Sequence, residues 1–130
     1  MIVVDTNVLV YLLIPGKFTL SAERLLAADP DWAAPRLWRS ELRNVLATYV
    51  RNMLMDVADA AALYQRAAAL IGPEEYDVET LDVLRLSKTS GCSGYDCEFI
   101  ALADFLGVKL VTTDTKLVKA FPARTTALLP

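Results

Sequence analysis

The sequence predicts a three-layer α/β/α sandwich, in which helices cover both faces of a central, mostly parallel sheet of about five strands. Short β-branched segments alternate with longer helical segments along the chain. The segment at residues 2–4 is β-branched and continuously apolar rather than alternating, which is typical of a parallel strand buried on both faces. We see no linker, repeat or low-complexity stretch, so we expect one domain over residues 1–130.

Capping and breaking residues mark the ends of the elements in the first half of the chain. Pro15 ends a short helix, Ser21 is expected to cap the next one, and Pro35 is expected to open a long one. Asp56 caps an alanine-rich helix that Gly72 breaks. In order, we expect a strand at 2–4, helices at 7–13 and 21–28, a strand at 32–34, and helices at 35–54 and 56–71.

The second half of the chain continues the same alternation. Gly91 and Gly94 bound a loop, Asp96 is expected to begin a helix, and Gly107 ends that helix. In order, we expect a strand at 76–78, helices at 80–89 and 96–106, a strand at 109–112, a helix at 115–120 and a strand at 124–128. In a parallel sheet of this kind, binding sites lie beyond the carboxyl ends of the strands.

Composition excludes several classes of protein. The chain has 130 residues, 55% of them hydrophobic and 22% charged, which is ordinary for an ordered globular domain. There is no histidine, so histidine triads and histidine-ligated zinc are excluded. The longest apolar run, residues 8–14, is far short of the ~20 residues that span a bilayer. We therefore expect no membrane segment.

The N-terminal residues and the cysteines indicate a cytoplasmic protein. No basic segment precedes the apolar residues 2–4, and Asp5 follows them, unlike a secretory signal. The two cysteines, Cys92 and Cys97, are too few for a disulfide scaffold, and we expect reduced thiols. The net charge of −3 argues against a nucleic-acid partner, unless bound divalent cations neutralise some of the carboxylates.

Four acidic residues occupy positions from which they can converge. Asp5 and Asp114 directly follow two predicted central strands, and Asp96 follows a loop rich in glycine and serine. Glu41 lies inside the long helix, at the border of its apolar stripe. Each has a simpler explanation: Asp96 and Asp114 as helix N-caps, and Glu41 as a solvated helix residue. Asp5, at the end of an apolar strand, is harder to explain in that way.

Convergence of these carboxylates would have a chemical consequence. Two like charges about 4 Å apart repel by about 4 kcal/mol at an effective dielectric constant of 20. Four carboxylates in one cleft must therefore take up protons or bind cations. A site made only of oxygen ligands suits hard divalent ions such as Mg²⁺ or Mn²⁺.

The ordered set of motifs resembles the PIN domain, and more narrowly the VapC-type toxins of toxin–antitoxin pairs. The resemblance covers nearly the whole chain and rests on Asp-Thr-Asn at 5–7, the lone Glu41, Tyr-Asp-Cys at 95–97 with Ile-Ala-Leu-Ala at 100–103, and Leu-Val-Thr-Thr-Asp at 110–114. Cys97 stands where alanine is frequent in the family. The resemblance implies an acidic quartet that binds Mg²⁺ or Mn²⁺, namely Asp5, Glu41, Asp96 and Asp114.

The resemblance also implies an activity and supporting residues. We expect a metal-dependent endoribonuclease that hydrolyses RNA phosphodiester bonds, with Asn7 and Thr112 as supporting polar residues. Our hypothesis is that Asp5 and Asp96 hold the principal metal, while the other two acids complete the site or bind a second ion. Basic residues near the expected cleft are candidates for binding substrate phosphates, or else a solvated cationic surface: Arg39, Arg43, Lys116 and Lys119.

The expected partners follow from apolar surface and from the resemblance. The helices at 21–28 and 35–54 carry more leucine and other apolar residues than one packing contact requires, which indicates an oligomer interface or a groove for a partner helix. By resemblance, these partners are a second copy of the chain, forming a homodimer, and a VapB-like antitoxin. The antitoxin would cover the acidic cleft, and such inhibitors often place an arginine among the carboxylates.

Other functions use parts of the same pattern. A PIN nuclease acting on DNA or in RNA maturation would share the whole site, and a non-catalytic binding module would keep only the fold. An intact acidic quartet argues against the binding module. Phosphoaspartyl receivers and phosphatases also place Asp after the first strand, but such a phosphatase has Asp-x-Asp where this chain has Asn7. A receiver has an acidic pair before a second, phospho-accepting Asp.

Overall fold

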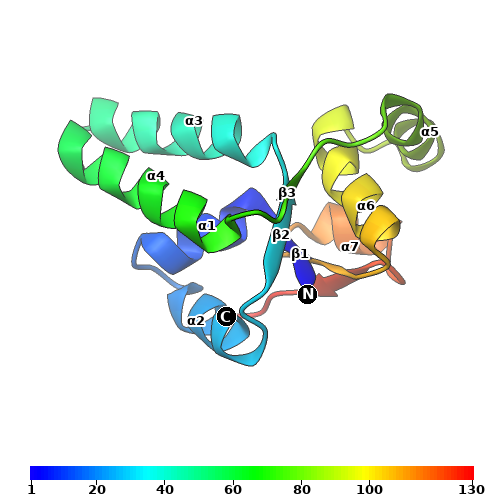
Figure 1. Cartoon of the computed structure of the whole chain (residues 1–130), viewed down its shortest axis with the longest axis horizontal. Coiled ribbons are helices and arrows are strands. Elements are labelled where there is room, and N and C mark those ends of the chain that lie inside the picture. Colours follow the sequence, from blue (N-terminus) through cyan, green and yellow to red (C-terminus); the bar gives the residue numbers. More distant parts are fainter.

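All 130 residues are described by the computed structural model, whose centre is one five-stranded sheet. The strand order is β3-β2-β1-β4-β5, and every neighbouring pair is parallel. The predicted parallel sheet of five strands is therefore confirmed (Figure 1). The strands are β1 (Ile2–Val4), β2 (Trp32–Pro35), β3 (Glu75–Tyr76), β4 (Leu110–Thr112) and β5 (Thr125–Ala127).

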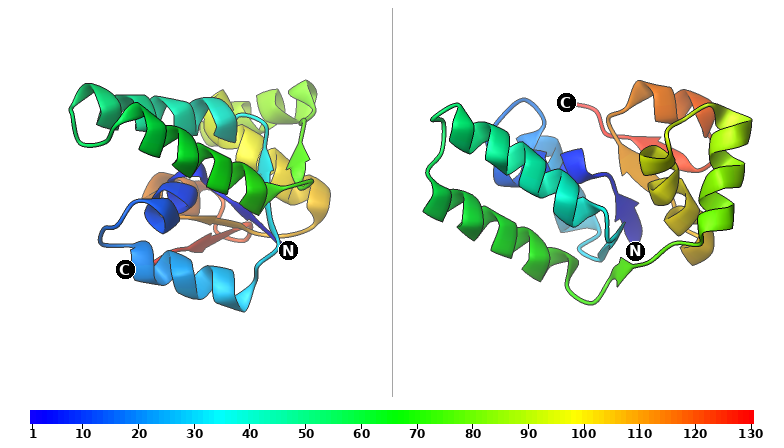
Figure 2. Two further views of the ribbon diagram at one scale, coloured as in Figure 1. Left: turned by 60° about the vertical axis from the view of Figure 1, so that its left-hand side comes forward. Right: turned by 90° about the horizontal axis from the view of Figure 1, so that it is seen from above.

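Seven helices form the two outer layers, as Figures 1 and 2 show. One face of the sheet carries α1 (Thr6–Leu13), α2 (Thr19–Ala28), α3 (Trp38–Arg51) and α4 (Val57–Ile71). The other face carries α5 (Thr80–Ser90), α6 (Gly94–Leu106) and α7 (Thr115–Ala120). None of these helices combines the length and the apolar character that crossing a membrane requires.

Two apolar cores hold the layers together, and β1 contributes to both. Val3 and Val4 are fully buried but point to opposite faces, because side chains alternate along a strand. Val4 packs with Trp32 and Trp38 in the core beneath α1–α4, and Val3 packs with Leu110 beneath α6 and α7. Burial on both faces explains why β1 is continuously apolar rather than alternating.

Strand order reverses between β1 and β4, and this places the candidate site. From β1 the chain proceeds outward to β2 and β3, whereas β4 and β5 lie on its other side. Val3 is in register with Leu110 and Val4 with Val111, so both strands end at the same edge. Segments that follow β1 and β4 therefore meet at the topological switch point of the sheet.

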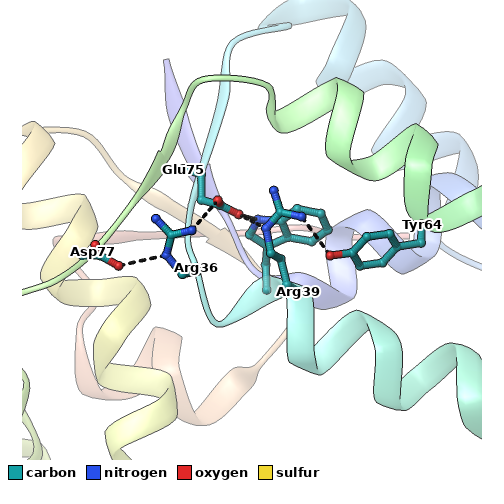
Figure 3. A network of polar contacts seen from close by, with 6 residues as sticks. Arg36, Arg39, Tyr64, Glu75 and Asp77 are labelled. Carbon is teal, nitrogen blue, oxygen red and sulfur yellow. Dashed lines mark hydrogen bonds and ion pairs between the residues drawn. The ribbon is translucent and has the colours of Figure 1, made fainter.

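A salt-bridged carboxylate joins β3 to the beginning of α3 (Figure 3). Glu75 accepts hydrogen bonds from Trp38 Nε1 at 2.7 Å, Arg39 Nε at 2.5 Å and Arg36 Nη1 at 3.2 Å. Arg39 also donates to the Tyr64 hydroxyl of α4 at 2.9 Å. Burial alone would raise the pKa of Glu75, but the hydrogen bonds from Arg39 and Trp38 outweigh burial and lower it. This network fixes the first turn of α3.

Two expected helix starts are wrong. Ser21 does not cap the second helix, which begins at Thr19; its hydroxyl instead donates to the Leu129 carbonyl at 2.5 Å. Pro35 belongs to β2 rather than to the long helix, which runs only over Trp38–Arg51. The backbone N–H of Arg36 still bonds to the Tyr76 carbonyl of β3, so pairing with β3 delays the helix.

The cap of α6 also differs from the expected one. The helix begins at Gly94, two residues before Asp96, and Ser93 is its cap: its hydroxyl accepts from the Asp96 N–H at 3.1 Å. At the first helix, α1 begins at Thr6, so Asn7 lies within it and does not cap it. Cys92 and Cys97 are buried, free thiols. Because Ser93 caps α6, helix capping does not explain the presence of Asp96.

Candidate active site

Asp5 leaves β1 at the switch point and is held by a neighbouring strand. Its backbone N–H bonds to the Val111 carbonyl of β4 at 3.1 Å. Its Oδ2 accepts a hydrogen bond of 2.7 Å from Thr112 Oγ1, and the same Oγ1 accepts from the Asp114 N–H at 3.0 Å. Thr112 is completely buried. One hydroxyl thus positions the two acidic segments that follow β1 and β4.

Asp114 caps α7 (Thr115–Ala120), which is the simpler explanation that the sequence offered for this residue. Its Oδ1 accepts from the backbone N–H groups of Lys116 at 2.9 Å and Leu117 at 3.4 Å, at the start of α7. These bonds use one carboxylate oxygen. Capping fixes the orientation of the side chain, while the second oxygen carries no hydrogen bond from the protein.

Glu41 reaches the site from the opposite direction, in the first turn of α3. Its Oε1 accepts a hydrogen bond of 2.7 Å from Thr6 Oγ1, the hydroxyl next in sequence to Asp5. Thr6 is 4% exposed and begins α1. Sequence analysis missed Thr6 as a positioning residue, although its place beside Asp5 in the Asp-Thr-Asn motif was a signal.

Burial and mutual repulsion raise the pKa values of three members of the acidic quartet. The pKa of Asp5 is raised by burial, with a further contribution from Asp96 and against the hydrogen bond from Thr112. The pKa of Glu41 is raised by burial and then by the charges of Asp5, Asp96 and Glu98. Burial and the charge of Asp114 raise the pKa of Asp96. These interactions link all four carboxylates electrostatically.

No basic side chain forms an ion pair with the acidic quartet. The ion pairs of the molecule join other groups: Met1–Asp29, Arg36–Glu75, Arg36–Asp77, Arg39–Glu75 and Arg124–Asp104. The charge of Lys116 favours ionised Asp96, but the two residues form no ion pair. Hydroxyl and backbone donors, rather than cations, therefore hold these carboxylates, and their negative charge is not neutralised.

The donor chemistry of the quartet fits a hard divalent cation. All side-chain ligands are carboxylate oxygens, and no group of three or more acidic, histidine or cysteine side chains is already arranged around a common metal position. Mg²⁺ usually keeps several waters and binds through one or two carboxylates, so it does not need such a cage. Closer coordination by three carboxylates would require side-chain rotation.

The structure separates two of the predicted basic residues from the acidic ones. Arg39 and Arg43 each lie two residues from Glu41 in α3, and positions two apart on a helix do not share a face. Arg39 pairs with Glu75, and Arg43 lies over the Tyr64 ring at 4.9 Å. Neither contacts a member of the quartet, and both instead pack α3 against its neighbours.

The remaining predicted residues lie close to the quartet or on exposed helix turns. Asn7 is exposed in the first turn of α1 and makes no side-chain hydrogen bond. Lys116 and Lys119 are exposed on α7, one turn apart. Glu98, two residues after Asp96, is half-buried on α6, and its charge acts on Glu41.

Fold and site together define the class: a parallel α/β sandwich with uncompensated carboxylates at its topological switch point. The family follows from sequence comparison. Residues 2–121 match the PIN domain, and the chain belongs to the PIN domain family.

Named relatives span essentially the whole chain. It is 27% identical over 128 residues to Ribonuclease VapC3 of Pyrobaculum aerophilum, covering 96% of this chain and 98% of that protein. The crystal structure of PAE2754 from the same organism has a TM-score of 0.76 and 22% identity, covering 97% of this chain and 89% of that one. A toxin–antitoxin complex from Klebsiella pneumoniae has a TM-score of 0.70 and 17% identity, covering 99% of this chain and 98% of that one. The two structures share the fold.

Proposed function

We propose that this protein is an Mg²⁺- or Mn²⁺-dependent endoribonuclease and the toxin of a VapBC-type toxin–antitoxin pair. One observation carries the proposal: carboxylates from four separate segments approach one another at the carboxyl edge of the sheet without a basic partner. Ribonuclease VapC3, similar over the full length, supports the reaction class. The absence of histidine agrees with hydrolysis that depends on a metal ion rather than on a histidine pair.

Each acidic residue has a proposed role. Asp5 and Asp96 hold the principal cation, and Glu41 and Asp114 complete the site or take part in binding a second ion. When bound, such a cation lowers the pKa of a water molecule and stabilises negative charge on the phosphate oxygens. Thr112 and Thr6 keep the Asp5 and Glu41 carboxylates in place through their hydroxyl groups.

Substrate phosphates need positive charge near this acidic edge. Lys116 is the best placed of the predicted basic residues, because its charge already acts on Asp96, and Lys119 follows one turn later. Arg39 and Arg43 are engaged with Glu75 and Tyr64, so we assign the phosphate contacts to the lysines. Asn7, exposed two residues after Asp5, is free to contact the substrate.

We propose that a VapB-like antitoxin inhibits the enzyme, and that the active form is a cytoplasmic homodimer. The toxin–antitoxin complex with the same fold supports such a partner. An apolar surface is available where α3 turns into α4: Met53 is 92% exposed, Val57 71% and Leu54 70%. Trp38, Leu42 and Leu46, which belong to the apolar face of the expected long helix, are buried in the protein's own core.

The test is cleavage of structured and unstructured RNAs by the purified protein, with Mg²⁺, Mn²⁺ or EDTA. We expect cleavage only with a divalent cation, and none by an Asp96→Asn variant that retains its circular dichroism spectrum. Cleavage that persists in EDTA, or in the folded Asp96→Asn protein, would contradict the assignment. Absence of cleavage by folded, partner-free wild-type protein on every RNA would favour a binding module.

A further inference from the structure

A cavity of about 450 Å³ opens beside the acidic quartet and has no role in the mechanism proposed above. It lies between α5, the segment that leads into α5, and the first turns of α6. Its size falls within the range of small-ligand sites in proteins, which is about 300–1,000 Å³. The residues that define its chemistry are Val78, Thr80, Val83, Gly94, Tyr95 and Glu98.

The cavity adjoins the candidate active site through α6. Gly94 and Tyr95 immediately precede Asp96 in the first turn of that helix. Glu98 lines the cavity two residues after Asp96, on the helix that carries both residues. A molecule that occupied the cavity would therefore be adjacent to the position where a phosphodiester bond is cleaved.

The lining combines an aromatic ring, an apolar wall and a carboxylate that has no basic partner. The Tyr95 side chain is 65% exposed, and Val78 and Val83 provide the apolar surface. Glu98 is half-buried, and neither a basic residue nor a hydrogen-bond donor of the protein engages its carboxylate. Aromatic side chains stack on nucleobases, and carboxylates accept hydrogen bonds from base edges. A phosphate group would be repelled by Glu98.

We propose that this cavity binds one unpaired nucleobase of the RNA substrate, next to the cleaved bond, and selects guanine. The inference rests on the proposed ribonuclease function and adds a determinant of its sequence preference. Tyr95 stacks on the base, Val78 and Val83 contact its other surface, and Glu98 accepts hydrogen bonds from its Watson–Crick edge. Tyr95 and Glu98 are specificity residues, and the acidic quartet remains the catalytic group.

Guanine matches the single carboxylate better than the other bases do. It presents two adjacent donors, N1–H and N2–H, to the two oxygens of Glu98. Adenine and cytosine each place an acceptor nitrogen next to their amino group, and uracil places carbonyl oxygens on both sides of its one N–H. A bidentate contact of this kind favours the matching base by about tenfold or more.

Gly94 offers a way to fill the cavity without removing any polar group. A Cβ atom at this position would lie 3.9 Å from Val83 Cγ1, at ordinary contact distance. The backbone of Gly94 has no positive φ, so Gly94→Leu adds volume to the cavity without backbone strain. Gly16→Leu is the matched control, because Gly16 also lacks a positive φ and a Cβ there meets nothing within 4 Å.

The first experiment measures binding in EDTA, where metal-dependent cleavage does not occur. We would titrate the protein with 5′-GMP, 5′-AMP, 5′-CMP or 5′-UMP and follow the NMR shifts of the Gly94 and Glu98 amides. GMP is expected to bind about tenfold more tightly than the others. We expect Glu98→Gln to remove this preference and Gly94→Leu to remove binding, whereas Gly16→Leu changes neither. Equal binding of all four nucleotides, or full GMP binding by Gly94→Leu, overturns the proposal.

The second experiment maps cleavage of a random-sequence RNA pool with Mn²⁺. We expect a guanine beside the cut for the wild type and for Gly16→Leu, and loss of that preference in Glu98→Gln. GMP binding in the cavity without any RNA cleavage would support the base-binding cavity and contradict the proposed ribonuclease activity. Cleavage that shows no guanine preference, or a preference that is unchanged in Glu98→Gln, would support the ribonuclease activity and overturn the base site.

Discussion

Two threonine hydroxyls orient carboxylates of this site, a role that arginine or lysine can have at a buried carboxylate. Thr112 holds Asp5 and Thr6 holds Glu41, each through a hydrogen bond of 2.7 Å. A basic partner would lower the pKa of a carboxylate but would also neutralise its charge. A hydroxyl orients the carboxylate and leaves its charge available to a cation, which is the property that a divalent-metal site requires.

Replacement of either principal acid by its amide tests the catalytic assignment. We expect Asp5→Asn and Asp96→Asn each to lower RNA cleavage by at least about 100-fold, because an amide is a poor ligand for Mg²⁺. Both variants should stay folded and gain stability at neutral pH, since a carboxyl group with a raised pKa is replaced by a neutral one. Cleavage rates and thermal unfolding together report these two effects.

Asp104→Asn is the matched control for Asp96→Asn. Asp104 lies on the same helix and is exposed, where it pairs with Arg124 at 3.3 Å. Its neutralisation is expected to leave cleavage within about twofold of wild type, because exposed ion pairs contribute little. Equal loss of activity in both variants would show that the charge of α6 as a whole, rather than Asp96, is required.

The Thr112 hydroxyl supports both Asp5 and the backbone of Asp114, and its removal should affect stability and activity together. We expect Thr112→Val to lower the free energy of unfolding by about 1–3 kcal/mol, because the Asp114 N–H loses its buried acceptor. Cleavage should fall as Asp5 loses its fixed orientation. Thr112→Ser, which keeps the hydroxyl, should recover most of the activity. Failure of Ser to outperform Val in the cleavage assay would contradict the positioning role.

At the scale of elements, the short strand β3 determines where Glu41 lies. This strand has only two residues, and backbone pairing alone holds it weakly to β2. Glu75 adds side-chain bonds to Arg36, Trp38 and Arg39, at the start of α3. The first turn of α3 carries Glu41, three residues after Trp38, so the network around Glu75 holds the turn from which this acidic residue extends.

Loss of the Glu75 carboxylate should therefore destabilise the fold and disturb the site. We expect Glu75→Ala to lower the free energy of unfolding by about 2 kcal/mol, since it leaves the Trp38 N–H without its partner. Chemical denaturation measures this change. Asp77→Ala is the control, because Asp77 is 82% exposed and pairs only with Arg36; its effect should be under about 0.5 kcal/mol. Equal effects of the two substitutions would contradict the proposed anchoring.

The elements that sequence analysis predicted correctly are those with a strong local signal. The continuously apolar segment of β1 and the alternation of helices and strands identified a parallel sheet. Asp5 and Asp114 followed from that sheet, because residues just after adjacent parallel strands must meet at one edge. Their proximity needed no knowledge of side-chain packing.

Predictions that depended on contacts between distant residues were less accurate. Pro35 looks like a helix start, but it belongs to β2 because β3, about 40 residues later, pairs with this segment. The basic residue Arg39 was grouped with the expected cleft, whereas Glu75 holds it elsewhere. The bond from Thr6 to Glu41 joins residues 35 apart. Periodicity and capping rules describe neighbours in sequence, so they contain no information on these pairs.

At the scale of the whole molecule, the acidic quartet couples the stability of the fold to pH. The pKa values of Asp5, Glu41 and Asp96 are raised in the folded protein, chiefly by burial. Between the ordinary carboxyl pKa of about 4 and these raised values, the folded state binds more protons than the unfolded state. The free energy of unfolding therefore falls as pH rises through this window, and the loss persists at neutral pH.

A bound cation should reverse this loss, which connects the stability of the molecule to its proposed function. At pH 7, Mn²⁺ at about ten times its dissociation constant should add about 1.4 kcal/mol and raise the Tm by about 5 °C. The increase should be smaller at pH 5, where protons compete for the same carboxylates. An Asp5→Asn/Asp96→Asn double variant should have a higher Tm than wild type without metal, and no response to Mn²⁺. Calorimetry at both pH values measures these shifts; a Tm increase that persists in the double variant would place the cation elsewhere on the molecule.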